Sequence, residues 1–273
     1  MLAMLIAGPF FACDARSLVP DAGTGTGGGG TGGTGGAGAG GDGGTGIVPD
    51  PPGASELLSD FEDLAGATVV RAGSPPRNGY WYAYNDADAT CVQTPAAGAL
   101  YVGEAPPTLA PWNSGGMALH GRWTGCNTWG AGVGADLNVP LVDGGVYMGP
   151  KVPYDVGAFG AITFWAMAAP GSDTRFRIKL PMRATTRIQD GGTCDESTVG
   201  PYKCGDDWGT VFNLASNGTW KQITVTFSNP AFRQEGWGAW FPWNPGDVTG
   251  IQIQSSDRGE PYDFWIDDMY LLP

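Results

Sequence analysis

A run of glycine and threonine decides which part of this chain can fold. Residues 23–46 read GTGTGGGGTGGTGGAGAGGDGGTG and contain no side chains from which a core could be built. This composition predicts a flexible linker. We therefore expect a signal segment at 1–13, a disordered Gly/Thr-rich tether at 14–54 and one folded domain at 55–273. The domain is rich in Trp, Tyr, Phe, Thr and Val and is long enough to bury a substantial core.

The N-terminal residues are similar to an export signal. Residues 1–12 (MLAMLIAGPFFA) are apolar, and this stretch is shorter than the roughly 20 residues that span a bilayer. It resembles the apolar region of a signal peptide, although no Lys or Arg precedes it. The letters FFAC, ending at Cys13, resemble a bacterial lipobox, in which the cysteine is lipidated after cleavage. We expect an exported protein, either a lipoprotein of the outer membrane or cell surface or a secreted protein.

Cysteine parity agrees with export. Without Cys13, four of the five cysteines remain, and an even number in an exported domain predicts disulfides. Three pairings are allowed; we favour Cys194–Cys204, which closes a short loop, together with Cys91–Cys126. The alternative is a zinc site made of all four thiolates, but the spacings lack the CxxC pairs that are usual in such sites.

The charge of the chain narrows its partners. The formal net charge is −13, and so acidic a surface repels nucleic acid and anionic lipid. Contact with a membrane is therefore expected only through a lipid on Cys13. A neutral polysaccharide meets no such repulsion. We expect the protein to be a monomer.

Several segments alternate apolar and polar residues, which predicts half-buried strands. The clearest is RFRIKL at 175–180, where Phe176 and Ile178 share one face while Arg177 and Lys179 share the other. Similar segments are found at 161–166, 223–227, 251–254 and 264–270. Residues 183–209 have no strand pattern and predict a long loop ordered by a disulfide. Many short strands without a long amphipathic helix indicate an all-β sandwich or barrel.

An ordered series of segments resembles a known family. The series is LLSDFED, ALHGRWTGCNTWGAGVGADL, GAITFWA, RFRIKLP, CGDDWG, GWG and YDFWIDDMYL. Together they resemble the galactose-binding-like jelly-roll domains that serve as carbohydrate-binding modules, including modules that bind β-glucan chains in an open cleft and relatives on bacterial surface lipoproteins. The resemblance implies a β-sandwich of two antiparallel sheets, a ligand cleft on the concave sheet and, often, a structural calcium ion.

The calcium expectation rests on carboxylates at the two ends of the domain. In the resembling modules the first and last strands are neighbours, and carboxylates there hold calcium. We place such a site first at Glu62 and Asp267, and then at Asp268 and Asp60. Calcium takes six to eight oxygen ligands, which paired carboxylates help to supply. The alternative is that these are ordinary solvated carboxylates at strand ends.

The polar faces of the strands give the first set of ligand-binding candidates. Sugars present apolar C–H faces and a rim of hydroxyls, to which proteins respond with flat aromatic rings and polar groups. If the non-core face is the concave one, it carries a polar and aromatic platform. The members are Arg177, Lys179, Gln252, Gln254, His120 and Trp265. The alternative is that they cover a convex, solvated sheet.

Two aromatic clusters give a second set. RNGYWYAYND contains Tyr80 to Tyr84, and GWGAWFPWNP contains three tryptophans. Neither cluster has clean strand spacing, so we expect some rings to be exposed on loops as stacking platforms. The best single candidates are Trp81 and Trp240.

Catalysis is not expected. His120 is the only histidine, and no GxSxG motif surrounds a serine. We interpret the chain as a non-catalytic binder of a glucan-like or other neutral polysaccharide. One alternative is a structural or adhesive lipoprotein that binds another protein. A second is a glycan-active hydrolase or lyase, which would need a carboxylate pair in the cleft; Asp206, Asp207, Glu196 and Glu235 are available.

Overall fold

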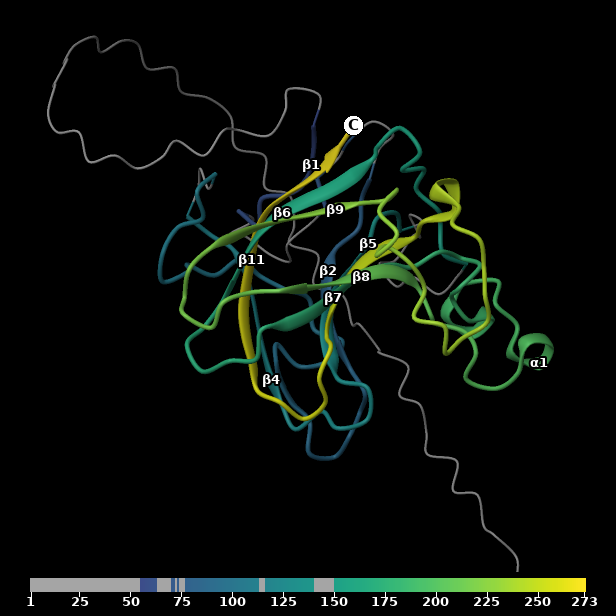
Figure 1. Cartoon of the computed structure of the whole chain (residues 1–273), viewed down its shortest axis with the longest axis horizontal. Coiled ribbons are helices and arrows are strands. Elements are labelled where there is room, and N and C mark those ends of the chain that lie inside the picture. Colours follow the sequence, from purple (N-terminus) through teal and green to yellow (C-terminus); the bar gives the residue numbers. More distant parts are fainter. Residues whose placement is uncertain (1–54, 63–69, 72, 74–76, 113–115, 140–149) are drawn as a thin grey trace, which may run out of the picture.

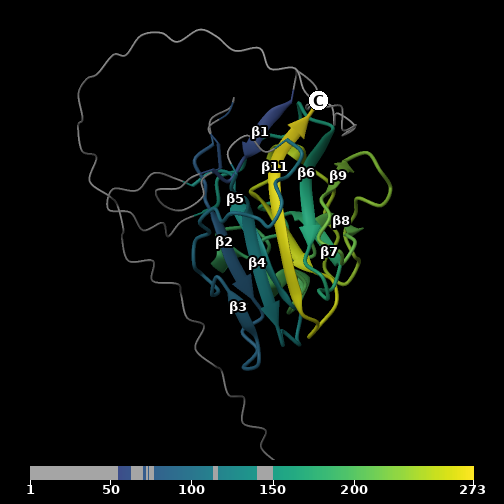
Figure 2. The same ribbon diagram turned by 90° about the vertical axis from the view of Figure 1, so that its left-hand side faces the viewer.

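Two antiparallel sheets packed face to face form the fold (Figures 1 and 2). The computed structural model describes residues 55–62, 70–71, 73, 77–112, 116–139 and 150–273. The predicted signal segment, the tether and Cys13 lie outside the described residues and remain predictions. Within the described ranges, no helix is both long enough and apolar enough to cross a membrane.

The first sheet has six strands in the order β3-β4-β11-β6-β9, with β1 paired to β11. Its strands are β1 (Glu56–Ser59), β3 (Val92–Thr94), β4 (Leu119–Thr124), β6 (Ala161–Ala168), β9 (Lys221–Thr226) and β11 (Tyr262–Leu272). The long strand β11 pairs with β4 along its first half and with β1 along its last residues. The first and last strands of the domain are therefore neighbours, as the family resemblance implies.

The second sheet has five strands in the order β2-β5-β10-β7-β8. Its strands are β2 (Trp81–Asn85), β5 (Ala131–Asp136), β7 (Arg175–Leu180), β8 (Trp208–Asn213) and β10 (Gly250–Ser255). Helical structure in the described residues is limited to α1 (Glu196–Val199), η1 (Ile188–Asp190) and η2 (Pro245–Asp247). The predicted all-β jelly-roll sandwich is confirmed.

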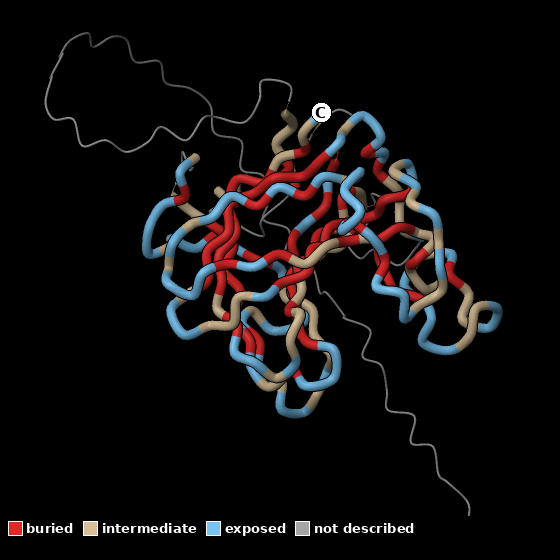
Figure 3. Tube along the Cα trace, in the orientation of Figure 1, coloured by how far each residue is buried: buried red, intermediate tan, exposed pale blue. Residues whose placement is uncertain are grey.

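Alternation along the strands builds the core between the sheets. On β7, Phe176 and Ile178 are fully buried, and on β10 Ile253 pairs with Ile178 on the same inner face. The opposing sheet contributes Phe164 and Phe264, which are also buried. Figure 3 shows that the buried segments follow the strands, whereas the connections are mostly exposed. The period-two pattern therefore predicted these inner faces correctly.

Both favoured disulfides are present. Cys91 is bonded to Cys126, and Cys194 is bonded to Cys204. This pairing is the predicted one, and it leaves no thiolates for the zinc alternative. The second disulfide lies in the segment between β7 and β8, which is largely irregular as predicted and which carries α1 on a projecting lobe (Figure 1).

Candidate functional site

A cleft of about 1080 Å³ lies on the outer face of the five-stranded sheet. Side chains that alternate with the core positions of three strands point into it, because successive residues of a strand face opposite sides of the sheet. They are Tyr82 and Tyr84 from β2, Gln252 and Gln254 from β10, and Arg177 and Lys179 from β7. The structure therefore brings together four of the predicted polar residues.

The base of the cleft is formed by tyrosine rings lying over glycines. Tyr82 is paired with Gly134 of β5, and Tyr84 with Gly132. A Cβ atom added to Gly134 would lie 3.0 Å from Cζ of Tyr82, and one added to Gly132 would lie 2.7 Å from Cζ of Tyr84. The phenol end of each ring thus occupies the space that a side chain on β5 would fill. The result is a broad aromatic surface beside the two glutamines.

The phenols of both tyrosines have raised pKa values. Burial is the main cause that raises the pKa of Tyr82, followed by the charge of Asp136, while a hydrogen bond with Gln252 opposes the rise. Burial also raises the pKa of Tyr84. The ring of Tyr84 stacks on Trp129 at 6.0 Å between centroids, and Nζ of Lys179 lies 5.9 Å above the same ring.

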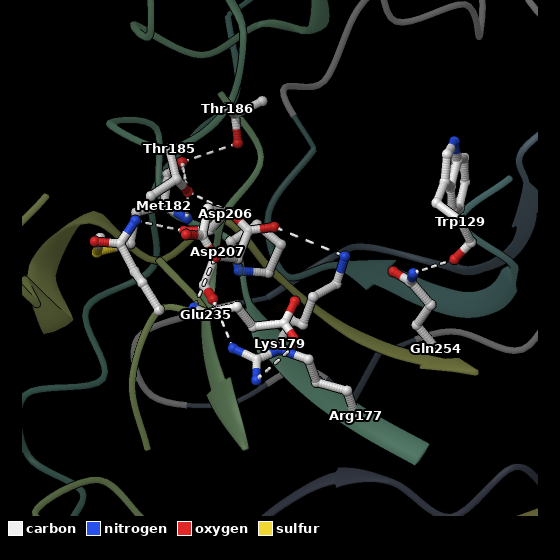
Figure 4. Close-up of polar contacts among 12 residues, drawn as sticks. Trp129, Arg177, Lys179, Met182, Thr185, Thr186, Asp206, Asp207, Glu235 and Gln254 are labelled. Atoms are coloured by element: carbon white, nitrogen blue, oxygen red, sulfur yellow. Dashed lines mark hydrogen bonds and ion pairs between the residues drawn. The ribbon is translucent and has the colours of Figure 1, made fainter. Parts of the chain in front are cut away.

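Arg177 and Lys179 connect the sheet to the loops around it (Figure 4). Nη2 of Arg177 donates to the backbone oxygens of Asp207 at 3.2 Å and Arg233 at 2.7 Å. Nζ of Lys179 lies 3.9 Å from Oδ2 of Asp207, whose carboxylate also accepts the hydroxyl of Thr185. Burial lowers the pKa of Lys179 and raises the pKa of Asp207, because both charges are removed from water.

Two partly exposed tryptophans, Trp129 and Trp237, lie at the rim of the cleft on different loops. Trp129 lies between β4 and β5 and is 42% exposed, and Nε2 of Gln254 donates to its backbone oxygen at 2.8 Å. Trp237 lies between β9 and β10 and is 47% exposed, and its Nε1 donates to Glu235 at 3.2 Å. Both line the cleft. Their exposed rings add stacking surfaces to the tyrosine base.

The charges of the cleft balance. Its lining contains five basic and five acidic residues. The basic ones are Lys151, Arg177, Lys179, Arg187 and Arg258, and the acidic ones are Asp136, Asp190, Glu196, Asp207 and Glu235. Several of them form pairs, such as Lys151 with Asp136 at 2.5 Å and Arg187 with Asp190 at 2.6 Å. A chain with a net charge of −13 thus presents a locally neutral cleft.

The prediction that Trp81 is an exposed stacking ring is wrong. Trp81 is only 1% exposed and packs in the core against Phe61 at 5.3 Å between centroids. Its Nε1 donates to Oγ of Ser59 at 2.8 Å. Residues 81–85 form strand β2 rather than a loop, and Trp81 shares its inward face with Ala83.

The predicted platform is also divided between two faces of the molecule. His120 on β4 and Trp265 on β11 belong to the six-stranded sheet, where their rings stack at 3.7 Å. The ring nitrogens of His120 lie 3.0 Å from Glu104 and 2.8 Å from Asp263. These two residues therefore lie on a different sheet from the cleft. The sequence could not show this, because the alternation of residues identifies the non-core side of each strand but not the sheet to which the strand belongs.

Trp240 is 75% exposed but lies outside the lining of the cleft. Its neighbour Trp237, three residues earlier, enters the lining instead. Tyr82 and Tyr84 belong to an aromatic cluster that the sequence predicts, but Trp81 was the preferred member, and Trp129 was not among the candidates. The signal that was available for the tyrosines is AGVGAD at 131–136, in which glycine alternates with buried Ala and Val and marks a strand with one bare face.

The carboxylates of the predicted calcium site differ in burial and in hydrogen bonding. Asp267 and Asp268 are buried on β11, so the description as solvated strand ends is wrong for them. Both oxygens of Asp60 accept hydrogen bonds from Arg71, and Glu62 accepts the backbone N–H of Met117 at 2.9 Å. In the described ranges, one set of three His, Cys, Asp or Glu residues brings its potential metal-binding atoms within 4.8 Å of one another. It consists of Asp86, Cys91 and Cys126, and its two cysteines form a disulfide.

Asp268 is the member of this set that fits a cation. Its Oδ2 is buried and has no hydrogen-bond partner among the described residues. Burial, followed by the charges of Asp60 and Glu62, raises the pKa of Asp268 to about 7. A bound cation would supply the missing partner and offset the repulsion between the three carboxylates.

Fold and cleft together define an all-β sandwich with an aromatic, charge-balanced cleft on one sheet. No protein-family model matches the sequence, and no curated protein matches it.

Solved structures that are similar to this chain include a family 11 carbohydrate-binding module from Clostridium thermocellum in complex with a β-1,3-1,4-mixed-linked tetrasaccharide. That structure has 14% identity and a TM-score of 0.43, with 80% of this chain and 95% of the module covered. The cleaved adhesin domain K1 of Lys-gingipain from Porphyromonas gingivalis has 11% identity and a TM-score of 0.39, with 80% and 98% covered. An exo-β-agarase has 10% identity and a TM-score of 0.42, with 80% of this chain but 25% of the enzyme covered.

Proposed function

We propose that this protein binds a neutral polysaccharide, without cleaving it, along the cleft of the five-stranded sheet. The observation that carries the proposal is the base of the cleft: Tyr82 and Tyr84 lie over glycines beside Gln252 and Gln254, and the surrounding charges balance. Flat rings complement the C–H faces of sugar rings, and amide groups both donate to and accept from hydroxyls. The similar structures include a binding module, an adhesin domain and an enzyme, so the fold itself does not choose between these functions.

The test is affinity electrophoresis of the full chain through gels that contain soluble neutral polysaccharides, with β-glucans first. We expect at least one polymer to retard the protein. Gln252→Ala should weaken that retardation by about tenfold in Kd, since it removes hydrogen bonds at the centre of the cleft. The matched control is Gln222→Ala, because Gln222 is an exposed glutamine on β9 of the other sheet. Equal loss in both variants, or no retardation of the folded wild type, would contradict the proposal.

A hydrolase is the second candidate, because Asp207 and Glu235 both line the cleft and burial raises the pKa of Asp207. A glycosidase places two carboxyl groups on either side of the scissile bond, one of them protonated. This candidate predicts release of oligosaccharides from the retarding polymer and loss of release in Glu235→Gln. Binding without release, measured by chromatography after prolonged incubation, is the outcome that we expect.

We also propose that a calcium ion is held near Asp268, with Glu62 and Asp267 as further ligands and with Asp60 engaged by Arg71. What supports this is the buried Oδ2 of Asp268, which has no hydrogen-bond partner among the described residues, together with the pKa of Asp268, which burial and the charges of Asp60 and Glu62 raise. The ion would stabilise the junction between β1 and β11. We expect a chelator to lower Tm by several degrees, calcium to restore it and Asp268→Asn to lose the response. An unchanged Tm in chelator would exclude the site.

The location of the protein is proposed from its N-terminus. We propose export and lipidation of Cys13, with the tether separating the domain from the membrane. Metabolic labelling with a fatty-acid analogue tests this: label should enter the wild type and be absent from Cys13→Ser.

A further inference from the structure

Trp129 and Trp237 each lie in a loop in which the carboxylate of one aspartate accepts hydrogen bonds from several backbone N–H groups. On one side of the cleft, Oδ2 of Asp86 accepts three consecutive backbone N–H groups, from Thr128 at 2.8 Å, Trp129 at 3.1 Å and Gly130 at 3.0 Å. The backbone N–H of Asp86 in turn donates to the oxygen of Gly130 at 3.0 Å. The loop that carries Trp129 is thus fixed through a residue that follows β2.

The same arrangement recurs on the other side. Asp206 is buried, and its carboxylate accepts the N–H groups of Glu235 at 2.8 Å, Gly236 at 2.8 Å and Gly238 at 3.1 Å. These three residues surround Trp237. A Cβ atom on Gly238 would lie 2.4 Å from Cβ of Asp206, so the loop packs directly against the aspartate.

These contacts hold the backbone that carries the two indoles. Both tryptophans are about half exposed, so the core does not fix their rings, and neither residue belongs to a strand or helix. A carboxylate that accepts several N–H groups forms charge-assisted hydrogen bonds, which are about twice as strong as neutral ones. Neither Asp86 nor Asp206 belongs to the lining of the cleft.

We propose that Asp86 and Asp206 are positioning residues that hold Trp129 and Trp237 at opposite sides of the cleft, so that the two indoles contact one bound glycan chain. This proposal rests on the proposed function for its ligand. It assigns to each aspartate an effect on binding that passes mainly through its own tryptophan.

Double-mutant cycles test this assignment with the polysaccharide that retards the wild type. We expect Trp237→Ala and Asp206→Ala each to raise Kd by about tenfold and the double variant to be no weaker than either single one by more than about twofold. Asp86→Ala and Trp129→Ala should behave likewise. The mismatched pair Asp206→Ala with Trp129→Ala is the control, and its two effects should multiply. Multiplying effects within a matched pair would overturn the proposal.

A measurement without ligand separates this proposal from the proposed function. In Asp206→Ala, the amides of Gly236 and Gly238 should exchange hydrogen at least about tenfold faster, while those of Thr128 and Gly130 keep their protection. Asp86→Ala should give the converse. If Asp206→Ala fails to fold, Asp206→Asn, which retains one acceptor oxygen, should give a smaller change in the same direction. Unchanged exchange would overturn the proposal even if the polysaccharide binds, and altered exchange without any binding polymer would contradict only the proposed function.

Discussion

At the scale of single residues, the lining of the cleft includes Asp207, a carboxyl group whose ionised form is destabilised by burial. Asp207, which directly precedes β8, is buried; Thr185 donates to its carboxylate, and Nζ of Lys179 lies 3.9 Å from its Oδ2. Burial outweighs both partners, so its pKa lies above the usual value of 3.8. The ionised form is therefore less stable in the folded protein than in the unfolded chain.

Asp207→Asn should be stabilised relative to the wild type as the pH rises. Asparagine imitates the protonated acid, so the two proteins should be similar well below pH 3.8, where Asp207 is protonated in both the folded and the unfolded state. The wild type then loses stability as the pH rises from the unfolded pKa towards the raised folded pKa, above which the loss is complete. A difference of one pH unit between the two pKa values corresponds to about 1.4 kcal/mol. Urea unfolding across this range measures the gap. A gap that narrows with rising pH would contradict the assignment.

At the scale of elements, alternation predicted some strands and could not predict others. RFRIKL has one apolar and one basic face, and β7 begins and ends where this pattern does. WYAYN has aromatic residues at both parities, so the sequence could not show that Trp81 faces inward and Tyr82 outward. AGVGAD has too little apolar surface to be recognised alone. The loops that carry Trp129 and Trp237 depend on hydrogen bonds between distant residues, which no local pattern encodes.

The Cys194–Cys204 disulfide belongs to this scale, because it closes the loop between β7 and β8 that borders the cleft. Replacing both cysteines by serine should lower the free energy of unfolding by about 2–3 kcal/mol. It should also weaken glycan binding, because Cys204 and Gly205 line the cleft. The control is Leu271→Ala, which opens a cavity in the core of the other sheet at a similar expected loss of about 2–5 kcal/mol. Undiminished affinity in the double serine variant would show that the loop does not shape the site.

At the scale of the whole molecule, the negative net charge of the chain lies outside the proposed ligand cleft. The chain carries −13, yet the cleft has equal numbers of acidic and basic residues. The first strand, β1, belongs to the six-stranded sheet, so the chain enters the domain on the sheet that does not carry the cleft. Polymer approaching the five-stranded sheet thus meets a surface that neither attracts nor repels it by net charge.

Binding of a neutral glycan should therefore depend little on salt. Between about 50 and 500 mM sodium chloride, Kd should change by less than about twofold, because the Debye length shortens without a net charge on the ligand to screen. Affinity electrophoresis repeated at several ionic strengths measures this. A steep loss of affinity with salt would instead indicate an anionic ligand held by Arg177 and Lys179.

The disulfide at the cleft also bears on how the protein withstands proteases. The stretch between Cys194 and Cys204 includes the exposed residues Ser197, Tyr202 and Lys203, and Tyr202 is 84% exposed. A protease that cuts there severs the backbone, but the two new ends stay joined through sulfur. Such a nicked molecule retains both halves of the loop beside the cleft, so a cut at its most accessible point does not release a fragment.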